Sequence, residues 1–234
     1  MKHSPKTYFN WSTGKDSSLA MYYLQREGIT VDLLLTSVNN HFNRVSMHGI
    51  RRELLHKQAK SLGIPLETIE LPETPSMEEY NEILQKKVKE LQAKNYTKAV
   101  FGDIFLEDLK VYRENQLKPY GIECYFPLWK KDTRKLVEEF IELGFKAVVV
   151  STKAELLDES FVGREISESF LKDLPKNVDP CGENGEFHTF CYDGPIFKSP
   201  ILFQIGEKQY KQYELEKGKE DTALGFWFCD LIPL

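Results

Sequence analysis

The chain has 234 residues, of which 41% are hydrophobic and 29% are charged, as is typical of a soluble globular protein with one large or two small domains. Its net charge of −5 and its lack of a long basic run exclude an extended nucleic-acid surface. No apolar run approaches the ~20 residues of a membrane helix, no apolar signal segment opens the chain, and the four cysteines form no close pair. We therefore expect a cytoplasmic protein with reduced thiols and no membrane contact.

A short strand, a turn of small residues and a helix are predicted between residues 7 and 26. Residues 7–11 are aromatic and favour a strand, and the apolar positions from Asp16 onward follow helical spacing. In such a turn several backbone N–H groups point outward at the positive end of the helix dipole. This arrangement indicates an anion site, and phosphate is the expected anion. The residues expected to contact a nucleotide there are Ser12, Thr13, Gly14, Lys15, Asp16 and Ser17.

Two kinds of phosphate loop can be told apart at this turn. The nucleotide-hydrolase loop requires a glycine where this chain has Phe9 and a serine or threonine where it has Asp16, so that loop is rejected. The turn instead resembles the Ser-Gly-Gly-Lys-Asp-Ser loop of the ATP pyrophosphatases, with Thr13 in place of the first glycine. Enzymes with that loop cleave ATP between the α and β phosphates. A plain turn capped by Ser12 and Asp16 is the alternative, and Asp16 could also help to hold Mg²⁺.

Alternating strands and helices continue to about residue 150. The pattern predicts an open parallel α/β sheet with helices on both faces, a Rossmann-like fold, in a domain of residues 1–150. Residues 151–234 are expected to form a smaller α+β domain. The predicted strands are 31–38, 66–71, 99–101 and 145–150. Two of the predicted helices are 47–62 and 107–120. Two more are expected to begin after the capping box of Ser76 and Glu79 and after Asp132.

Ligands of such sheets lie at the carboxyl ends of the strands. The turns that follow Trp11, Val38 and Phe101 are all at that edge, so we expect one shared pocket. The further residues expected to contact the nucleotide are therefore Ser37, His48, Gly102 and Asp103. Asp103 is also the predicted Mg²⁺ ligand, with a simple turn aspartate as the alternative. For His48 the alternative is a plain helix-start histidine, which chemistry alone favours.

The second dense stretch is residues 179–190. Gly182 and Gly185 predict tight turns, and Glu183, Glu186 and His188 would then project polar groups. A zinc site of Cys181, His188 and Cys191 would lack a fourth ligand and matches no common zinc motif, so it is not favoured.

With this stretch in place, the chain resembles the diphthine–ammonia ligase (diphthamide synthetase) family of pyrophosphate-loop ATPases. The segments that carry the resemblance span nearly the whole chain in order: 12–17, 47–51, 101–104, 126–129, 161–164 and 181–189. The resemblance implies an adenine nucleotide alpha hydrolase-like fold. It also implies that ATP adenylates the carboxylate of diphthine, a modified histidine on a translation elongation factor, and that ammonia then displaces AMP. Free ammonia is the expected donor because the chain has no recognisable glutaminase half.

The resemblance implies roles for individual residues. Lys15 and Mg²⁺ would offset the phosphate charge, and Glu183 and Glu186 would bind the cationic part of diphthine or deprotonate ammonia. Diphthine bears a quaternary ammonium, so Phe187, Tyr192 and Trp129 could add ring faces. The predicted substrate-binding residues are Arg164, Asn184, His188 and Thr189. A solvated hairpin of acids and a surface ion pair of Arg164 are the alternatives.

Two other functions are compatible with the sequence. The first is an ATP pyrophosphatase that acts on a different carboxylate or on a thiolation substrate, which is favoured if the source is bacterial. The second is a nucleotide-binding module without turnover. The oligomeric state stays open, a homo-oligomer included.

Overall fold

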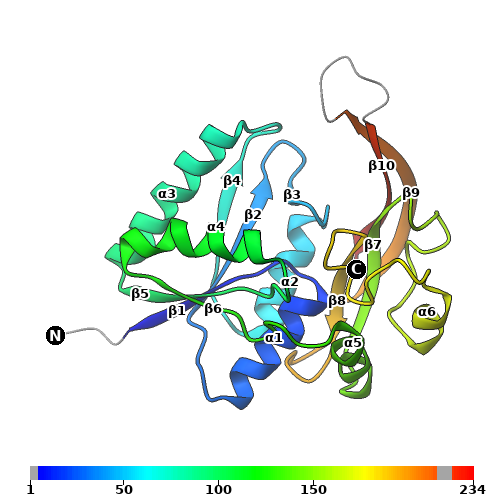
Figure 1. Ribbon diagram of the computed structural model, residues 1–234, viewed down its shortest axis with the longest axis horizontal. Helices are drawn as coiled ribbons and strands as arrows, with labels where there is room; N and C mark the ends of the chain where they lie inside the picture. The colour runs from blue at the N-terminus through cyan, green and yellow to red at the C-terminus, as the bar shows by residue number, and fades with distance from the viewer. Residues whose placement is uncertain (1–4, 215–222) are drawn as a thin grey trace.

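The structure is a computed structural model that describes residues 5–214 and 223–234. Its first layer is an open sheet whose parallel strands lie in the order β4-β2-β1-β5-β6 (Figure 1). Strand order reverses between β1 and β5, which is the switch point where ligands bind in such sheets. The strands are β1 (Lys6–Asn10), β2 (Leu33–Asn39), β4 (Leu66–Leu71), β5 (Tyr96–Val100) and β6 (Glu123–Tyr125), with a short antiparallel β3 (Arg44–Val45) beside the end of β2.

Helices cover both faces of this sheet because its central strands are apolar on both sides. Tyr8 points into the core that is formed with α3 and α4, whereas its neighbour Phe9 points into the core that is formed with α1 and α2. These cores confirm the predicted parallel α/β fold. The helices are α1 (Lys15–Arg26), α2 (Arg52–Leu62), α3 (Met77–Ala93) and α4 (Glu107–Leu117), the last extended by a 3₁₀ turn, η1 (Lys118–Tyr120).

The predicted helix signals are confirmed at three ends. Ser76 and Glu79 form the reciprocal capping box of α3, and the Asp132 side chain accepts a hydrogen bond from the Lys135 N–H at the start of α5. Gly63 ends α2 in the left-handed region with φ of 72°.

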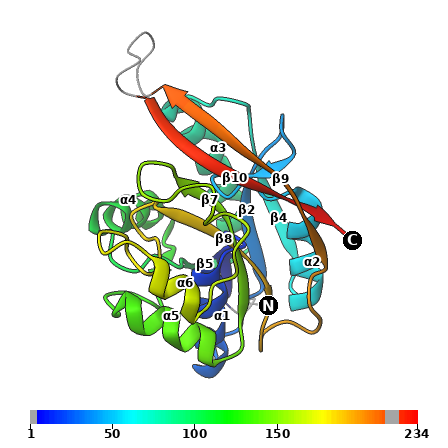
Figure 2. The same ribbon diagram turned by 90° about the vertical axis from the view of Figure 1, so that its right-hand side faces the viewer.

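A second sheet lies beside the first, in the antiparallel order β8-β7-β10-β9 (Figure 2). One apolar core joins this sheet to α1 and α2, and Phe187 and Phe190 of β8 both belong to it. The strands are β7 (Lys146–Lys153), β8 (Phe187–Asp193), β9 (Phe203–Glu214) and β10 (Ala223–Pro233), accompanied by α5 (Thr133–Glu142) and α6 (Glu168–Asp173).

Two predictions were wrong in detail. The helix predicted from residue 47 begins only at Arg52, because Met47 and Gly49 have positive φ values of 66° and 69°. The strand predicted at 145–150 is β7, which lies in the antiparallel sheet rather than in the parallel one. The polar segment after residue 203, for which the sequence predicts no element, is a strand, β9, because pairing with β10 stabilises it where its own apolar pattern is weak.

None of the helices within residues 5–214 and 223–234 combines the length and the apolar character that crossing a bilayer requires.

Candidate active site

The turn between β1 and α1 lies at the switch point of the parallel sheet. Thr13 has a φ of 75°, the left-handed region that a β-branched residue rarely occupies, at the position where the resembling loop has glycine. Its hydroxyl is buried without a hydrogen-bond partner. Gly14 is the N-cap of α1, and its N–H donates to Ser12 Oγ over 3.3 Å. The backbone therefore has the strained, N–H-rich form that suits an anion site.

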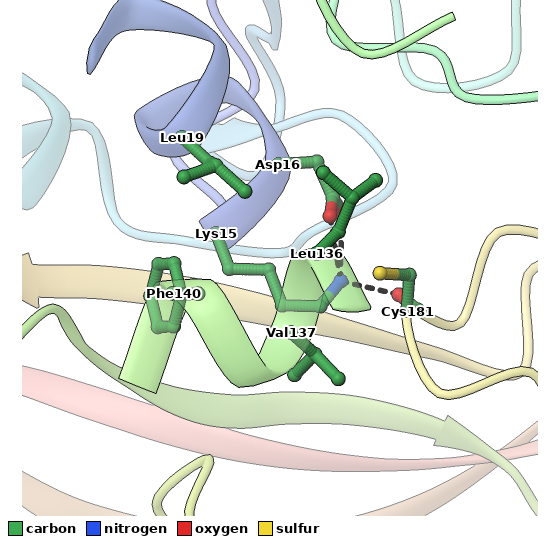
Figure 3. A pocket seen from close by; sticks show the side chains of 7 residues that line it. All are labelled: Lys15, Asp16, Leu19, Leu136, Val137, Phe140 and Cys181. Carbon is green, nitrogen blue, oxygen red and sulfur yellow. Dashed lines mark hydrogen bonds and ion pairs between the residues drawn. The ribbon is translucent and has the colours of Figure 1, made fainter. Parts of the chain in front are cut away.

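Lys15 is buried at the start of α1. Its Nζ lies 2.8 Å from Asp16 Oδ2 and also donates to the Cys181 carbonyl (Figure 3). Burial would lower the pKa of Lys15, but the Asp16 carboxylate holds that pKa above its usual value, so the ammonium stays charged. Apolar side chains from α1 and α5 surround the stem of Lys15: Leu19, Leu136, Val137 and Phe140.

Strand β8 is hydrogen-bonded to this turn. The Lys15 N–H donates to Thr189 Oγ1 over 3.0 Å, and the Cys191 N–H donates to the Thr13 carbonyl over 2.9 Å. The predicted substrate residue Thr189 thus lies on the turn between β1 and α1. The second sheet is in place to exclude water from that turn.

Gln58 joins the same contact and was missed from the sequence. Its Nε2 donates to the carbonyls of Thr13 and Cys191, over 3.0 and 2.5 Å, and its Oε1 accepts from Trp11 Nε1. The sequence feature that could have pointed to Gln58 is its place among the apolar positions of α2. A glutamine buried there must find hydrogen-bond partners for its amide.

The end of β5 approaches the start of α1. A Cβ on Gly102 would lie 3.2 Å from the Ser17 backbone nitrogen, so glycine allows this close approach. Asp103 faces Arg113, whose Nε lies 3.0 Å from Oδ2 without the alignment of a hydrogen bond. Arg113 Nη2 also donates to Asp103 Oδ1 over 3.1 Å, so this carboxylate is held in an ion pair with Arg113 in which only Oδ2 lacks an aligned hydrogen bond.

Glu183 connects the second motif to the end of β5. Its Oε1 accepts the Ile104 N–H over 2.7 Å. The pKa of Glu183 is raised to about 7, chiefly by burial. The hydrogen bond from the Ile104 N–H lowers this pKa, whereas the nearby carboxylates of Asp16 and Asp103 raise it. A carboxyl group that titrates near neutral pH beside a charged lysine can accept or donate a proton.

Glu186 is a different kind of acid. Its carboxylate is buried and accepts the N–H groups of Asp179 and Asn184, over 3.0 and 2.9 Å, and the Asn184 side-chain amide over 3.0 Å. These three bonds brace the turn that holds Glu183 and Cys181. The contacts favour a positioning role for Glu186 and Asn184, whereas direct roles in binding or catalysis stay predictions.

Two histidines flank the turn from outside. His48 Nδ1 lies 3.0 Å from the Thr189 carbonyl, and the His48 and His188 rings are 4.6 Å apart. Burial lowers the pKa of His48 to about 3 and that of His188 to about 4. Nearby positive charge acts in the same direction: His188 and Lys15 lower the pKa of His48, and Lys15 lowers that of His188. Both rings are neutral at physiological pH, so they add no charge next to Lys15.

Other predicted residues have contacts of their own. Arg164 forms an ion pair with Asp173 at 2.7 Å and lies over the rings of Phe161 and Phe170, which corresponds to the surface-pair alternative. The Ser37 carbonyl accepts the Ser46 N–H and ties the segment that carries His48 to β2.

The ring faces proposed for the cation also have partners. Phe187 is buried beneath Lys15 Nζ, and Tyr192 donates to Glu165. Trp129 lies under Lys110 Nζ at 4.8 Å. Within the described part of the chain, no group of three or more His, Cys, Asp or Glu side chains has the arrangement of a metal site.

Two family models match the chain. The diphthamide synthase N-terminal domain matches residues 5–123, and the diphthamide synthase C-terminal domain matches residues 132–220.

Curated relatives are named diphthine–ammonia ligase. The protein of Schizosaccharomyces pombe is 33% identical over 93 residues, which are 38% of this chain and 15% of that protein. That of Bos taurus is 31% identical over 111 residues, 45% of this chain and 42% of that protein. That of Danio rerio is 25% identical over 217 residues, 84% of this chain and 85% of that protein. The match thus spans less than half the length of the first two relatives.

Proposed function

The chain belongs to the diphthamide synthase family, and on this basis we propose that it is an ATP-dependent ligase that turns an acceptor carboxylate into an amide. The acceptor is diphthine on a translation elongation factor, the nitrogen comes from ammonia, and the products besides diphthamide are AMP and pyrophosphate. The names of the curated relatives support this assignment.

One observation carries the proposal: Lys15 is held, charged and buried, at the positive end of α1 and directly beneath an acid-bearing turn. The N–H groups of the turn and the lysine bind the β and γ phosphates. With these phosphates fixed, the acceptor carboxylate attacks the α phosphorus and pyrophosphate leaves. Negative charge develops on the phosphates in that step, and stabilising it is the main electrostatic contribution of the site.

Mg²⁺ fits this site by the chemistry of its oxygens. Asp103 has a buried carboxylate oxygen without a hydrogen bond, and Asp16 and Glu183 lie within electrostatic reach of each other. Mg²⁺ is commonly held by one or two carboxylates together with substrate phosphates, so a full protein cage is not needed. Asp103 and Asp16 would hold the ion, which supplies positive charge to the triphosphate when bound.

Glu183 serves the second step. Ammonia attacks the acyl group, and the nitrogen must lose a proton as AMP leaves. Glu183 is fixed by the Ile104 N–H, and its pKa of about 7 lets it accept that proton at neutral pH. The bracing by Glu186 keeps this carboxylate over Lys15.

The packing of β8 on the turn protects the intermediate. An acyl-adenylate hydrolyses readily, and Thr13, Lys15 and Thr189 are all buried where the second sheet meets the turn. Water is therefore kept from the carbonyl that ammonia must reach.

The test is incubation with ATP, Mg²⁺ and ammonium chloride, with and without an elongation factor that carries diphthine, followed by separation of the nucleotides. We expect AMP and pyrophosphate only when the acceptor is present, with amide formation seen as a mass change on the factor. Formation of ADP would reject the assignment of the loop. AMP that forms with other carboxylates but never with diphthine would retain the loop and replace the acceptor.

A further inference from the structure

The buried side chain of Gln58 joins α2 to the turn between β1 and α1 and to strand β8. Its Oε1 accepts from Trp11 Nε1 over 2.8 Å, and its Nε2 donates to the carbonyls of Thr13 and Cys191. An indole N–H can only donate, so Trp11 fixes which end of the amide is the oxygen. Both N–H groups of the Gln58 amide are therefore available to the two carbonyls.

The Thr13 carbonyl accepts from two donors at once. Gln58 Nε2 donates to it over 3.0 Å and the Cys191 N–H over 2.9 Å. In a planar trans peptide the carbonyl and the following N–H point in opposite directions. Holding the Thr13 carbonyl toward α2 and β8 therefore directs the Gly14 N–H away from them. The hydrogen bond of that N–H to Ser12 Oγ is long, at 3.3 Å, so the N–H can be given to a stronger acceptor.

The peptide that Gln58 holds is strained. Thr13 has a φ of 75°, which a β-branched residue adopts only where its surroundings fix it. Among the described residues, its hydroxyl has no hydrogen-bond partner, so the side chain does not fix this conformation by hydrogen bonding. The hydrogen bonds to the Thr13 carbonyl therefore act as the restraint.

We propose that Gln58 is a positioning residue for the nucleotide. From the side opposite the phosphates, it keeps the peptide between Thr13 and Gly14 in the orientation that presents the Gly14 N–H to them. A donor that is already oriented binds an anion without the cost of ordering it. The inference rests on the proposed function in assigning a triphosphate to this turn.

Gln58→Met tests this role, because methionine fills about the same space and cannot donate to a carbonyl. The KM for ATP should rise at least ~10-fold, whereas the KM values for ammonia and for the acceptor should not change. The affinity for α,β-methylene-ATP with Mg²⁺, measured by calorimetry, should fall by the same factor. An unchanged KM for ATP together with an unchanged affinity for the analogue would overturn the proposal.

Ser61→Ala is the matched control on the same helix. Ser61 is buried like Gln58, and its Oγ donates to the Ser199 carbonyl over 2.6 Å and accepts the Ser199 N–H over 3.1 Å, away from the turn. Its replacement should lower stability toward urea and leave the KM for ATP unchanged. Both variants are assayed at a temperature at which they are folded. Equal rises of the KM for ATP in the two variants would show that Gln58 acts through stability alone, and would overturn the proposal.

Gln58→Glu makes the donor depend on pH, and it carries the test if Gln58→Met does not fold. Burial and the two carbonyl oxygens should raise the pKa of this carboxyl group, and its protonated form can donate to a carbonyl. Relative to the natural chain at the same pH, its affinity for the analogue should be low at about pH 8 and should recover towards about pH 5. An equal loss at both ends of that range would contradict the role of this hydrogen bond.

Binding of the analogue needs no turnover, so the two proposals can fail separately. If the natural chain binds the analogue and forms no AMP, only the proposed reaction fails, and the affinities of the variants still decide the role of Gln58. If the natural chain is active and Gln58→Met binds the analogue normally, only the role of Gln58 fails. A natural chain that does not bind the analogue would overturn both.

Discussion

Lys15 shows how a single side chain can be prepared for phosphate. In the structure its ammonium is satisfied by Asp16 and by the Cys181 carbonyl, so its burial does not leave an unpaired charge. A triphosphate offers more negative charge than these two partners together. We therefore expect Lys15 to exchange the carbonyl for phosphate oxygen when ATP binds.

Replacement of Lys15 tests that role. Lys15→Met keeps the apolar stem and removes the charge, so AMP formation should fall at least ~100-fold. The loss of stability should be modest, about 1–2 kcal/mol, because Asp16 is 30% exposed and water can solvate its carboxylate. Initial rates and urea unfolding measure the two effects. The control is Lys172→Met, a substitution at an exposed position of α6. Normal turnover in Lys15→Met would show that Lys15 has no role in the reaction.

Glu183 should produce a pH dependence. The carboxyl group loses its proton as pH rises through about 7, so the rate should increase over that range if the carboxylate is the base. Free ammonia, not total ammonium, must be held constant in this measurement. Glu183→Gln can still accept the Ile104 N–H, and it should abolish the rise near pH 7 and lower kcat by about 10²–10⁴-fold, with ATP affinity retained. A rise that persists in this variant would assign the pKa to another group.

Glu186→Gln provides the contrast. The amide nitrogen of glutamine would face backbone N–H donors in place of a carboxylate oxygen, so about 1–3 kcal/mol of stability should be lost through the turn. Transfer to the acceptor should weaken, whereas nucleotide binding should persist. Loss of ATP affinity without loss of stability would place Glu186 on the nucleotide.

At the scale of elements, the segment between β3 and α2 is tied to the second sheet by charge. Arg44 Nη1 lies 2.8 Å from Asp230 Oδ1, and Arg51 Nη2 lies 2.5 Å from Asp230 Oδ2. Burial would raise the pKa of Asp230, but the hydrogen bonds from the two arginines hold it below its usual value. This contact holds the segment that carries His48 against β10.

Asp230→Asn should therefore destabilise the protein by about 1–2 kcal/mol at pH 7. Because the folded-state pKa of Asp230 is depressed, its contribution is present above the unfolded-state pKa and is lost as pH falls through the folded-state pKa. The difference in unfolding free energy between Asp230→Asn and the natural chain should shrink from pH 7 towards pH 3. Equal differences at both ends of that range would show that the charge is not what stabilises the contact.

The elements that local chemistry specifies could be predicted from the sequence. The capping box of Ser76, the end of α2 at Gly63 and the strand–turn–helix around Lys15 each depend on neighbouring residues. Features set by tertiary contacts could not be predicted. The partner of β7 is chosen by packing with β8 and β10, and β9 is a strand because it pairs with β10.

The same distinction holds for the candidate site. Lys15, Glu183 and Thr189 were named from motif chemistry, and the fold brings them together although 174 residues separate Lys15 from Thr189. The contribution of Cys181 is a backbone carbonyl, which no side-chain pattern can reveal. Arg164 was named by resemblance, but its ion pair is with Asp173.

At the scale of the whole molecule, two sheets share one core and meet at the turn between β1 and α1. The parallel sheet supplies the turn at its switch point, and the segment after β3 carries His48. Strand β8 of the antiparallel sheet and the turn before it supply Glu183, Glu186, His188 and the hydroxyl of Thr189 (the two sheets are seen in Figures 1 and 2).

Under the proposed function, the first sheet binds phosphate and the second carries the acceptor chemistry. When a nucleotide binds, we expect the Lys15 N–H to exchange Thr189 Oγ1 for a phosphate oxygen, while the hydrogen bond from the Cys191 N–H to the Thr13 carbonyl keeps the two sheets in contact.

A crystal structure with α,β-methylene-ATP, which cannot be cleaved between the first two phosphates, tests this arrangement most directly. We expect the β and γ phosphates on the N–H groups of residues 13–15, Lys15 Nζ turned from the Cys181 carbonyl to phosphate oxygen, and the α phosphorus on the side of Glu183. An analogue bound away from an unchanged turn, with Lys15 still donating to Cys181, would contradict the account.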